Sequence, residues 1–171
     1  WCLLLAGCIT LAVAGQLSDL TERFDDFLLD RAAPLVRTPP PPDIVIVTID
    51  DASLAEVGAW PWSRTVHARL IDQLARNRAR LVLYDVLFVE PTVPAADADL
   101  ATAVASAGNV VLPYAMQPRQ NASSGLEPQY PLASLHHNAA ALGHVLAEHD
   151  ADGVLRHTNL WLHEEGGQSY P

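Results

Sequence analysis

Cysteine is nearly absent from this chain. Only two of its 171 residues are cysteines, Cys2 and Cys8, and both lie in the apolar stretch that leads the sequence. The rest of the chain contains none, which excludes a disulfide framework and a thiolate metal site there. This composition is compatible with an oxidising compartment, and we expect the two cysteines to serve as small apolar side chains.

Positive charge is scarce as well. Ten Lys and Arg residues stand against 20 Asp and Glu residues, so the formal net charge is −10, and no tract is rich in basic residues. A surface of this sign repels the phosphates of nucleic acid. We therefore exclude nucleic acid as a partner.

The sequence signatures of common catalytic sites are also missing. There is no Gly-x-Ser-x-Gly elbow, no phosphate-binding P-loop, no Gly-x-Gly-x-x-Gly and no His-Glu-x-x-His. The seven histidines lack the spacing of metal ligands, since His136 and His137 are adjacent and His157 and His163 are six residues apart. We predict no catalytic residue, no metal site and no cofactor in this part of the protein.

Charged residues are absent from the first 18 residues, and the first charge is that of Asp19. Because a membrane-spanning helix needs about 20 apolar residues, we expect residues 1–18 to be the outer part of a transmembrane helix that begins before the sequence does. A cleaved signal peptide is the alternative, because Ala12-Val13-Ala14 has the small-x-small form of a cleavage site. In both cases the residues that follow lie outside the cytoplasm.

Residues 19–42 are predicted to be a juxtamembrane helix followed by a linker. Apolar residues continue at helical spacing beyond the small-x-small site, at Leu17, Leu20, Phe24 and Phe27. This spacing favours an uncleaved anchor and predicts a helix over residues 16–33. The apolar seam fits either a coiled-coil homodimer or packing against the protein's own domain. Prolines at positions 39–42 then form a stiff, extended spacer.

Residues 43–171 alternate between strand-like and helix-like segments. The expected elements are strands at 44–50, 81–88 and 110–116 and helices at 53–58, 64–77 and 97–108. This order predicts an α/β fold with a mainly parallel sheet flanked by helices, the three-layer arrangement of Rossmann-like domains. Residues 142–148 and 154–163 are expected to form a C-terminal antiparallel strand pair.

Several polar residues have the positions of helix caps. Ser53 and Glu56 have capping-box spacing, and Ser63 and Asp97 each precede or open a helical segment. Gly108 is expected to end the helix that Asp97 begins. A tight turn is predicted at residues 150–153, whose Asp-x-Asp-Gly start of a calcium loop lacks the downstream glutamate.

Three carboxylates are expected at neighbouring strand ends. Asp50 and Asp51 close the first expected strand and Asp85 lies in the second, at the edge where open α/β sheets keep their binding crevices. Together they suit a divalent cation or a cationic ligand. We prefer a structural role, with Asp51 as a helix cap and with Asp50 or Asp85 as acceptors of backbone N–H groups or partners of Arg64.

Two tryptophans flank Pro61 at the same edge, and Arg64 follows them. Trp60 and Trp62 suit the wall of a ligand pocket or a surface for a partner, although such a motif more often plugs one end of a core. Arg64 is the better candidate for binding, because its guanidinium matches carboxylates and phosphates. An internal ion pair is the alternative role of Arg64.

Several of these segments together resemble the CHASE domain of the second type, the cyclases/histidine kinases associated sensory extracellular domain. The resemblance covers about residues 40–171. The segments that carry it are 43–54, 60–64, 84–88, 97–100, 108–113, 142–145 and 150–156. Each segment is short, and their common order along the chain makes the resemblance specific.

The resemblance implies signal input rather than catalysis. Such domains belong to bacterial receptors of the inner (plasma) membrane, in which further membrane helices and a cytoplasmic adenylate or guanylate cyclase or a kinase usually follow. The family pattern would also continue beyond Pro171 into another helix, so we expect this chain to be a piece of a longer protein. Residues after about 18 would then lie in the periplasm.

Our leading hypothesis is a non-catalytic sensory domain with an unknown extracytoplasmic ligand. The stimulus would bind near Asp50, Asp51, Trp60, Trp62, Arg64 and Asp85. It would bias two arrangements of the juxtamembrane helix, which passes the change to the membrane in a homodimer. Two alternatives stay open: a metal-dependent extracytoplasmic hydrolase that uses the three aspartates as ligands and Arg64 for a phosphate, and an assembly module whose two tryptophans bind a partner protein.

Overall fold

The computed structural model describes residues 1, 5, 7, 20–36, 39, 41–119, 126–147, 149–150, 152–163 and 169–170. The chain divides into two compact units, Trp1–Ile49 and Asp50–Pro171, which are described separately. The predicted transmembrane segment, residues 1–18, lies outside the described residues apart from three isolated positions. Within the described part of the chain, no helix combines the length and the apolar composition that a membrane crossing requires.

The first unit contains helix α2, Leu20–Ala32, and the 3-10 helix η1, Ala33–Val36. Helix α2 agrees with the predicted helix where the two overlap, and Pro34 stands where the α-helix gives way. Three aromatic and aliphatic side chains of α2 lie at helical spacing and are about half exposed or more, namely Phe24, Phe27 and Leu28. They form one apolar side of α2 that the described residues of this unit leave exposed.

The predicted strand at residues 44–50 is wrong for this structure. These residues lie in no helix or strand, and the aliphatic side chains among them are 40–83% exposed. A run of β-branched residues favours the conformation of a strand, but a strand forms only where a neighbour accepts and donates its hydrogen bonds. In the structure these residues belong to none of the sheets that are described.

A sheet organises the second unit. Strand β2, Val110–Pro118, is its centre and pairs in parallel with β1, Val82–Leu83, and with β4, Ala141–His144. Strand β3, Leu126–Gln129, pairs antiparallel with the last residues of β2. The predicted α/β class with a parallel sheet is confirmed, although β1 is much shorter than the predicted strand at 81–88.

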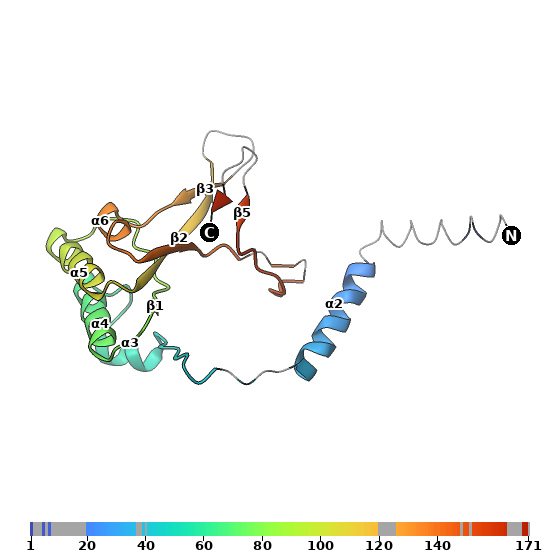
Figure 1. Cartoon of the computed structure of the whole chain (residues 1–171), viewed down its shortest axis with the longest axis horizontal. Coiled ribbons are helices and arrows are strands. Elements are labelled where there is room, and N and C mark those ends of the chain that lie inside the picture. The colour runs from blue at the N-terminus through green and yellow to red at the C-terminus, as the bar shows by residue number, and fades with distance from the viewer. Residues whose placement is uncertain are drawn as a thin grey trace. The chain divides into compact units, whose positions relative to one another are not determined.

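Helices α4, Arg64–Arg76, and α5, Pro94–Ala107, lie side by side and cover one face of the sheet (Figure 1). The fully buried side chains of Ile71 in α4 and of Leu100 and Val104 in α5 face the buried residues of β1 and β2. In β1 the buried Val82 is followed by the exposed Leu83, whereas Leu112, Pro113 and Tyr114 of β2 are all buried, as in a strand that is covered on both faces. The core of the unit is this helix-to-sheet layer.

The ends of the helices follow local chemistry. Ser63 caps α4 as predicted, since its hydroxyl accepts a hydrogen bond from the Thr65 N–H. Gly108 ends α5 as predicted, with a φ of +66° that suits glycine. The predicted cap at Asp97 is wrong: α5 begins three residues earlier at Pro94, whose missing N–H suits the first position of a helix.

Helix α3, Asp51–Val57, is short and is capped by the residue before it. The Asp50 carboxylate accepts hydrogen bonds from the Ser53 N–H at 2.9 Å and from the Ser53 hydroxyl at 2.7 Å. The capping box therefore joins Asp50 and Ser53 rather than Ser53 and Glu56, and Asp51 stands in the first turn instead of the cap position. Gly58 closes this helix as expected.

The predicted C-terminal strand pair is wrong in its membership. Residues 141–144 form β4, which pairs in parallel with β2 after the short helix α6, Ala133–His136. The antiparallel pair at the C-terminus consists instead of β5, Leu162–His163, and β6, Ser169–Tyr170. The pairing of β4 with β2 joins residues about 30 positions apart in the sequence, and the composition of a strand does not specify such a partner.

Candidate functional site

Arg64 is the first residue of α4, and its guanidinium lies against the first turn of α5. Its Nε atom is 3.5 Å from Oδ1 of Asp97, and its Nη2 donates a hydrogen bond to the Glu90 carbonyl at 3.2 Å. The guanidinium carbon is 4.3 Å from the centroid of the Phe88 ring, within reach of a cation–π interaction. With side chains only 13% and 12% exposed, Arg64 and Asp97 form a largely buried ion pair.

Asp97 is held in place from a second direction. Its carboxylate accepts hydrogen bonds from the Thr92 N–H and from the Thr92 hydroxyl, both at 2.8 Å. Burial alone would raise the pKa of Asp97, but the two Thr92 hydrogen bonds and the Arg64 charge outweigh it and lower that pKa below its usual value. Asp97 is therefore ionised and joins the loop before α5 to the start of α4.

Behind the ion pair lies a cluster of aromatic rings. The Trp60 ring is 5.6 Å from both the Trp62 and the His67 rings, and the His67 ring is 5.2 Å from that of Phe88. The Trp62 indole N–H donates to the Gly58 carbonyl at 2.7 Å. Trp62 is partly buried and lies 6.1 Å from the His67 ring, whereas Trp60 is 45% exposed.

His67 and Tyr84 form a buried hydrogen bond beneath these rings. Nδ1 of His67 is 2.7 Å from the Tyr84 hydroxyl, and both residues are buried. Burial, followed by the nearby charge of Arg64, lowers the pKa of His67, although a hydrogen bond to the Trp62 carbonyl opposes this effect. Burial also raises the pKa of Tyr84. Both groups are favoured in their neutral forms, and the Nδ1 of a neutral His67 protonated at Nε2 accepts a hydrogen bond from the Tyr84 hydroxyl.

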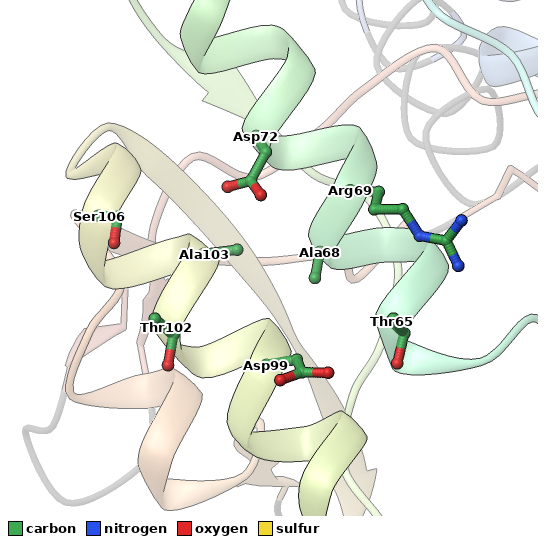
Figure 2. A pocket seen from close by; sticks show the side chains of 8 residues that line it. All are labelled: Thr65, Ala68, Arg69, Asp72, Asp99, Thr102, Ala103 and Ser106. Atoms are coloured by element: carbon green, nitrogen blue, oxygen red, sulfur yellow. The ribbon is translucent and has the colours of Figure 1, made fainter.

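A groove runs between the outer sides of α4 and α5 and begins beside this cluster (Figure 2). Its volume is about 420 Å³. The residues that line it are Thr65, Ala68, Arg69 and Asp72 of α4 and Asp99, Thr102, Ala103 and Ser106 of α5. Small and hydroxyl side chains leave the space open, and its first residue, Thr65, directly follows Arg64.

The structure does not gather the three predicted acidic residues into one site. Asp50 caps α3, and its hydrogen bonds with Ser53 lower its pKa. Asp51 lies in the first turn of that helix, and Asp85 is exposed. Among the described residues, no group of three His, Cys, Asp or Glu side chains is arranged to hold a metal ion. The hydrolase alternative thus lacks the ligand set on which it depended.

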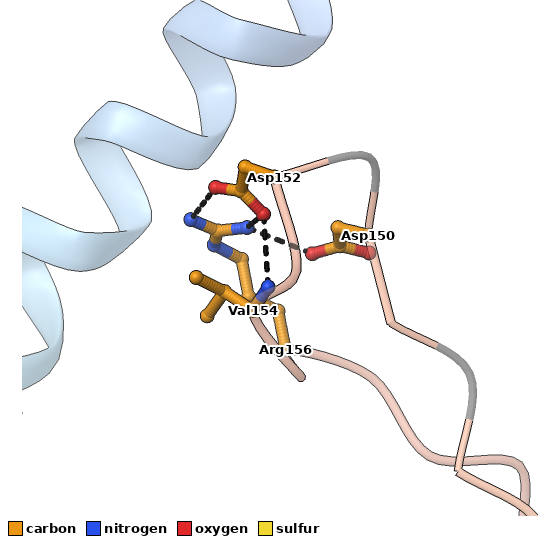
Figure 3. A network of polar contacts seen from close by, with 4 residues as sticks. All are labelled: Asp150, Asp152, Val154 and Arg156. Carbon is orange, nitrogen blue, oxygen red and sulfur yellow. Dashed lines mark hydrogen bonds and ion pairs between the residues drawn. The ribbon is translucent and has the colours of Figure 1, made fainter.

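Two further aspartates, Asp150 and Asp152, bind the side chain of Arg156 (Figure 3). Arg156 donates one hydrogen bond to Asp150 at 2.9 Å and binds both carboxylate oxygens of Asp152, at 2.9 and 2.7 Å. With the Val154 N–H, these bonds lower the pKa of Asp152 to about 2. The Gly153 N–H donates to the Asp150 carbonyl at 2.8 Å. The predicted tight turn is confirmed, and the Arg156 guanidinium binds the carboxylates of both aspartates.

The structure thus brings together Trp60, Trp62 and Arg64 of the predicted site and leaves the aspartates apart. The partners that the sequence analysis missed are His67, Tyr84, Phe88, Thr92 and Asp97. One signal was available, because His67 stands one helical turn after Arg64 and therefore on the same side of α4. Nothing in the spacing indicated that Thr92 would hold Asp97.

Comparison with known proteins gives one family. The profile of the CHASE2 domain matches residues 4–171, almost the entire chain. No curated protein and no solved structure gives a significant match. CHASE2 domains are extracellular sensory domains of membrane receptors and are not themselves catalytic. The resemblance on which the sequence analysis relied is therefore confirmed, and the chain belongs to the CHASE2 domain family.

Proposed function

We propose that this chain is the signal-input domain of a bacterial membrane receptor, lies on the outer side of the inner membrane, and controls a cytoplasmic adenylate or guanylate cyclase or a kinase. Membership of the CHASE2 family supports an extracellular sensory role. The net charge of −10 and the cysteine-free domain agree with an extracytoplasmic location. The output enzyme lies elsewhere in the receptor.

The observation that carries the proposal is the ion pair between the first turns of α4 and α5. Arg64 and Asp97 are largely buried, and a buried pair is held only while its geometry is good, because both charges have lost their hydration. The Nε atom of Arg64 is buried and faces Oδ1 of Asp97 at 3.5 Å without forming a hydrogen bond to any described residue. An anionic group on a ligand, a carboxylate or a phosphate, would match this guanidinium and compete with Asp97.

The stimulus site in this proposal comprises Trp60, Trp62 and Arg64, with Asp97 in place of the three predicted aspartates. The half-exposed Trp60 ring offers a flat apolar contact beside the guanidinium. The groove between α4 and α5 extends from the same end and provides hydroxyl groups. A ligand that binds more tightly when Arg64 and Asp97 are separated would favour that arrangement of α4 and α5. The size of the population shift is set by the difference in the ligand's affinity for the two arrangements.

Helix α2 is the element that we propose to carry the signal in a homodimer. Its exposed Phe24, Phe27 and Leu28 have the spacing of a seam between two parallel helices. Two copies that pack along this side would bury apolar surface that a single copy leaves in water. In this proposal, a small change in the register or crossing angle of the two α2 helices is transmitted to the membrane helices.

The test uses the intact receptor, with its basal output measured as cyclic-nucleotide synthesis or phosphorylation. Arg64→Ala removes one partner of the buried pair and leaves Asp97 uncompensated, so we expect basal output to change several-fold. Arg76→Ala, at the exposed end of the same helix, is the matched control and should leave output at the wild-type level. Wild-type output from a folded Arg64→Ala receptor would defeat the proposed site.

A further inference from the structure

His67 lies close to the ion pair of the proposed stimulus site, on the same side of α4 as Arg64. The His67 ring is 5.2 Å from the Phe88 ring, and the Arg64 guanidinium carbon is 4.3 Å from the centroid of that same ring. His67 is 1% exposed. The guanidinium stays charged at every pH that a protein meets, whereas an imidazole can gain a proton. A permanent cation and a titratable base therefore share one buried surrounding.

Uncharged groups surround most of the His67 ring. Its Nδ1 is 2.7 Å from the Tyr84 hydroxyl, and the rings of Trp60 and Trp62 lie 5.6 and 6.1 Å away. The Trp62 carbonyl favours the protonated ring, but burial and the charge of Arg64 outweigh it and lower the pKa of His67. Protonation of Nδ1 also turns an acceptor into a donor, so the hydrogen bond from Tyr84 is lost or reversed.

No carboxylate stands ready to balance a charge on His67. Asp97 already accepts two hydrogen bonds from Thr92 and faces Arg64. Asp85 and Glu90, which belong to the segment after β1, are exposed. Among the described residues, no carboxylate forms an ion pair with His67. A proton on His67 therefore adds a second cation beside Arg64 without adding an anion.

The contact between Arg64 and Asp97 is the part of the cluster that can give way. The Nε atom of Arg64 lies 3.5 Å from Asp97 and makes no hydrogen bond to any described residue. The bonds from Thr92 to Asp97 are shorter, at 2.8 Å. Because Arg64 cannot lose its proton, it relieves the repulsion by moving its head group toward water on its long side chain.

We propose that protons are a second input to this receptor: protonation of His67 separates Arg64 from Asp97 and favours the arrangement that an anionic ligand favours. The inference rests on the proposed function, because it assigns regulation by external pH to the same ion pair. The paired arrangement lowers the pKa of His67 below the ordinary value of about 6.5. The separated arrangement thus binds protons more tightly, and a pH below about 6.5 increases its population.

The test measures output of the complete receptor in cells at external pH 7.5 and 5, with the cytoplasmic pH monitored and constant. We expect wild-type output to change several-fold, in the direction in which Arg64→Ala moves it at pH 7.5. His67→Gln cannot take up a proton and should lose this response. His137→Gln, at an exposed histidine of the same unit, is the matched control and should keep the whole response.

An NMR titration of the histidine ring nitrogens tests the coupling without the output enzyme. It uses the full chain in detergent, and the His67 signal is identified by its absence from His67→Gln and its shift in Tyr84→Phe. We expect Arg64→Ala to raise the pKa of His67, because it removes a cation from beside the ring. Arg76→Ala, at the exposed end of the same helix, should leave that pKa unchanged.

Three results would overturn the inference: equal wild-type output at both pH values, an undiminished response in His67→Gln, or a His67 pKa that Arg64→Ala does not alter. The first and third need no His67 variant that folds. All three leave the proposed function standing as long as Arg64→Ala changes output at pH 7.5. If a folded Arg64→Ala receptor has wild-type output at both pH values, the proposed function fails and this inference fails with it.

Discussion

At the scale of single residues, the second unit concentrates its polar groups where α4 and α5 begin. Arg64 is placed by the cap of its helix, and Asp97 is placed by two hydrogen bonds from Thr92. His67 and Tyr84 satisfy each other behind them. Buried polar groups stay compatible with a fold only while each has its partner, so this cluster is sensitive to the loss of any member.

Tyr84→Phe tests the buried hydrogen bond. The substitution keeps the aromatic ring and removes the hydroxyl that lies 2.7 Å from Nδ1 of His67. A buried acceptor without its donor costs about 1–3 kcal/mol, so we expect the free energy of unfolding in urea to fall by that amount. Tyr130→Phe, at a more exposed tyrosine, is the control and should cost far less. Equal stability of the Tyr84→Phe and wild-type proteins would contradict the hydrogen bond.

The same pair predicts a dependence of stability on pH. Burial and the charge of Arg64 lower the pKa of His67 in the folded protein, whereas the unfolded chain has the ordinary value of about 6.5. The unfolded state therefore binds more protons as the pH falls, and the stability present above about pH 6.5 is lost toward the lowered pKa. Urea unfolding at pH 7.5, 6 and 5 should give a falling free energy of unfolding.

His67→Gln removes this titration and is the matched variant for the pH series. Its free energy of unfolding should change less between pH 7.5 and pH 5 than that of the wild type. The lowered pKa values of Asp97 and Asp152 act in a separate window, because their stabilisation is lost only below about pH 4. The same slope in both proteins would mean that another group titrates.

At the scale of elements, α5 of the second unit ends at the glycine that the sequence predicts. Gly108 has a φ of +66°, and a Cβ added there would lie 4.0 Å from the nearest atom, the Ala105 carbonyl oxygen. Gly108→Ala therefore meets backbone strain rather than a clash, and we expect a loss of about 1 kcal/mol in thermal or urea unfolding. Gly108→Asn should lose less, since asparagine tolerates this conformation. No loss with alanine would contradict the left-handed end of α5.

Features set by neighbouring residues were easier to predict from the sequence than the pairing of strands. Ser63, Gly108 and the turn at 150–153 act through neighbours a few residues away, so their spacing alone predicted them correctly. Residues 44–50 and 142–148 have the composition of strands, but which strand they pair with depends on distant residues. Composition predicted the parallel α/β class and could not assign every strand to it.

The same distinction applies to the residues of the candidate site. Trp60, Trp62 and Arg64 were identified because they are close together in the sequence and chemically distinctive. Spacing predicts a helix cap at Asp97 and gives no sign of its ion pair with Arg64, because that pair exists only when the two helices have packed side by side. The prediction that Asp50, Asp51 and Asp85 lie close together depended on a strand at residues 44–50. The structure has no strand there.

At the scale of the whole molecule, we propose that different elements of the sensory domain bind the stimulus and transmit the signal. The proposed stimulus site lies where α4 and α5 begin, and the exposed apolar side of α2 is the proposed seam between two copies. The first is a largely buried ion pair, and the second exposes the aromatic side chains of Phe24 and Phe27. Membership of the CHASE2 family supplies the setting in which such surfaces have a use.

One measurement tests the central claim most directly: a double-mutant cycle on the output of the complete receptor. Basal output is compared for wild type, Arg64→Ala, Asp97→Ala and the double variant, with folding checked in each. If the ion pair is the switch that a stimulus opens, each single variant changes output and the double variant changes it no further. Effects that add, or outputs that all equal the wild type, would contradict the claim that this pair governs the signal.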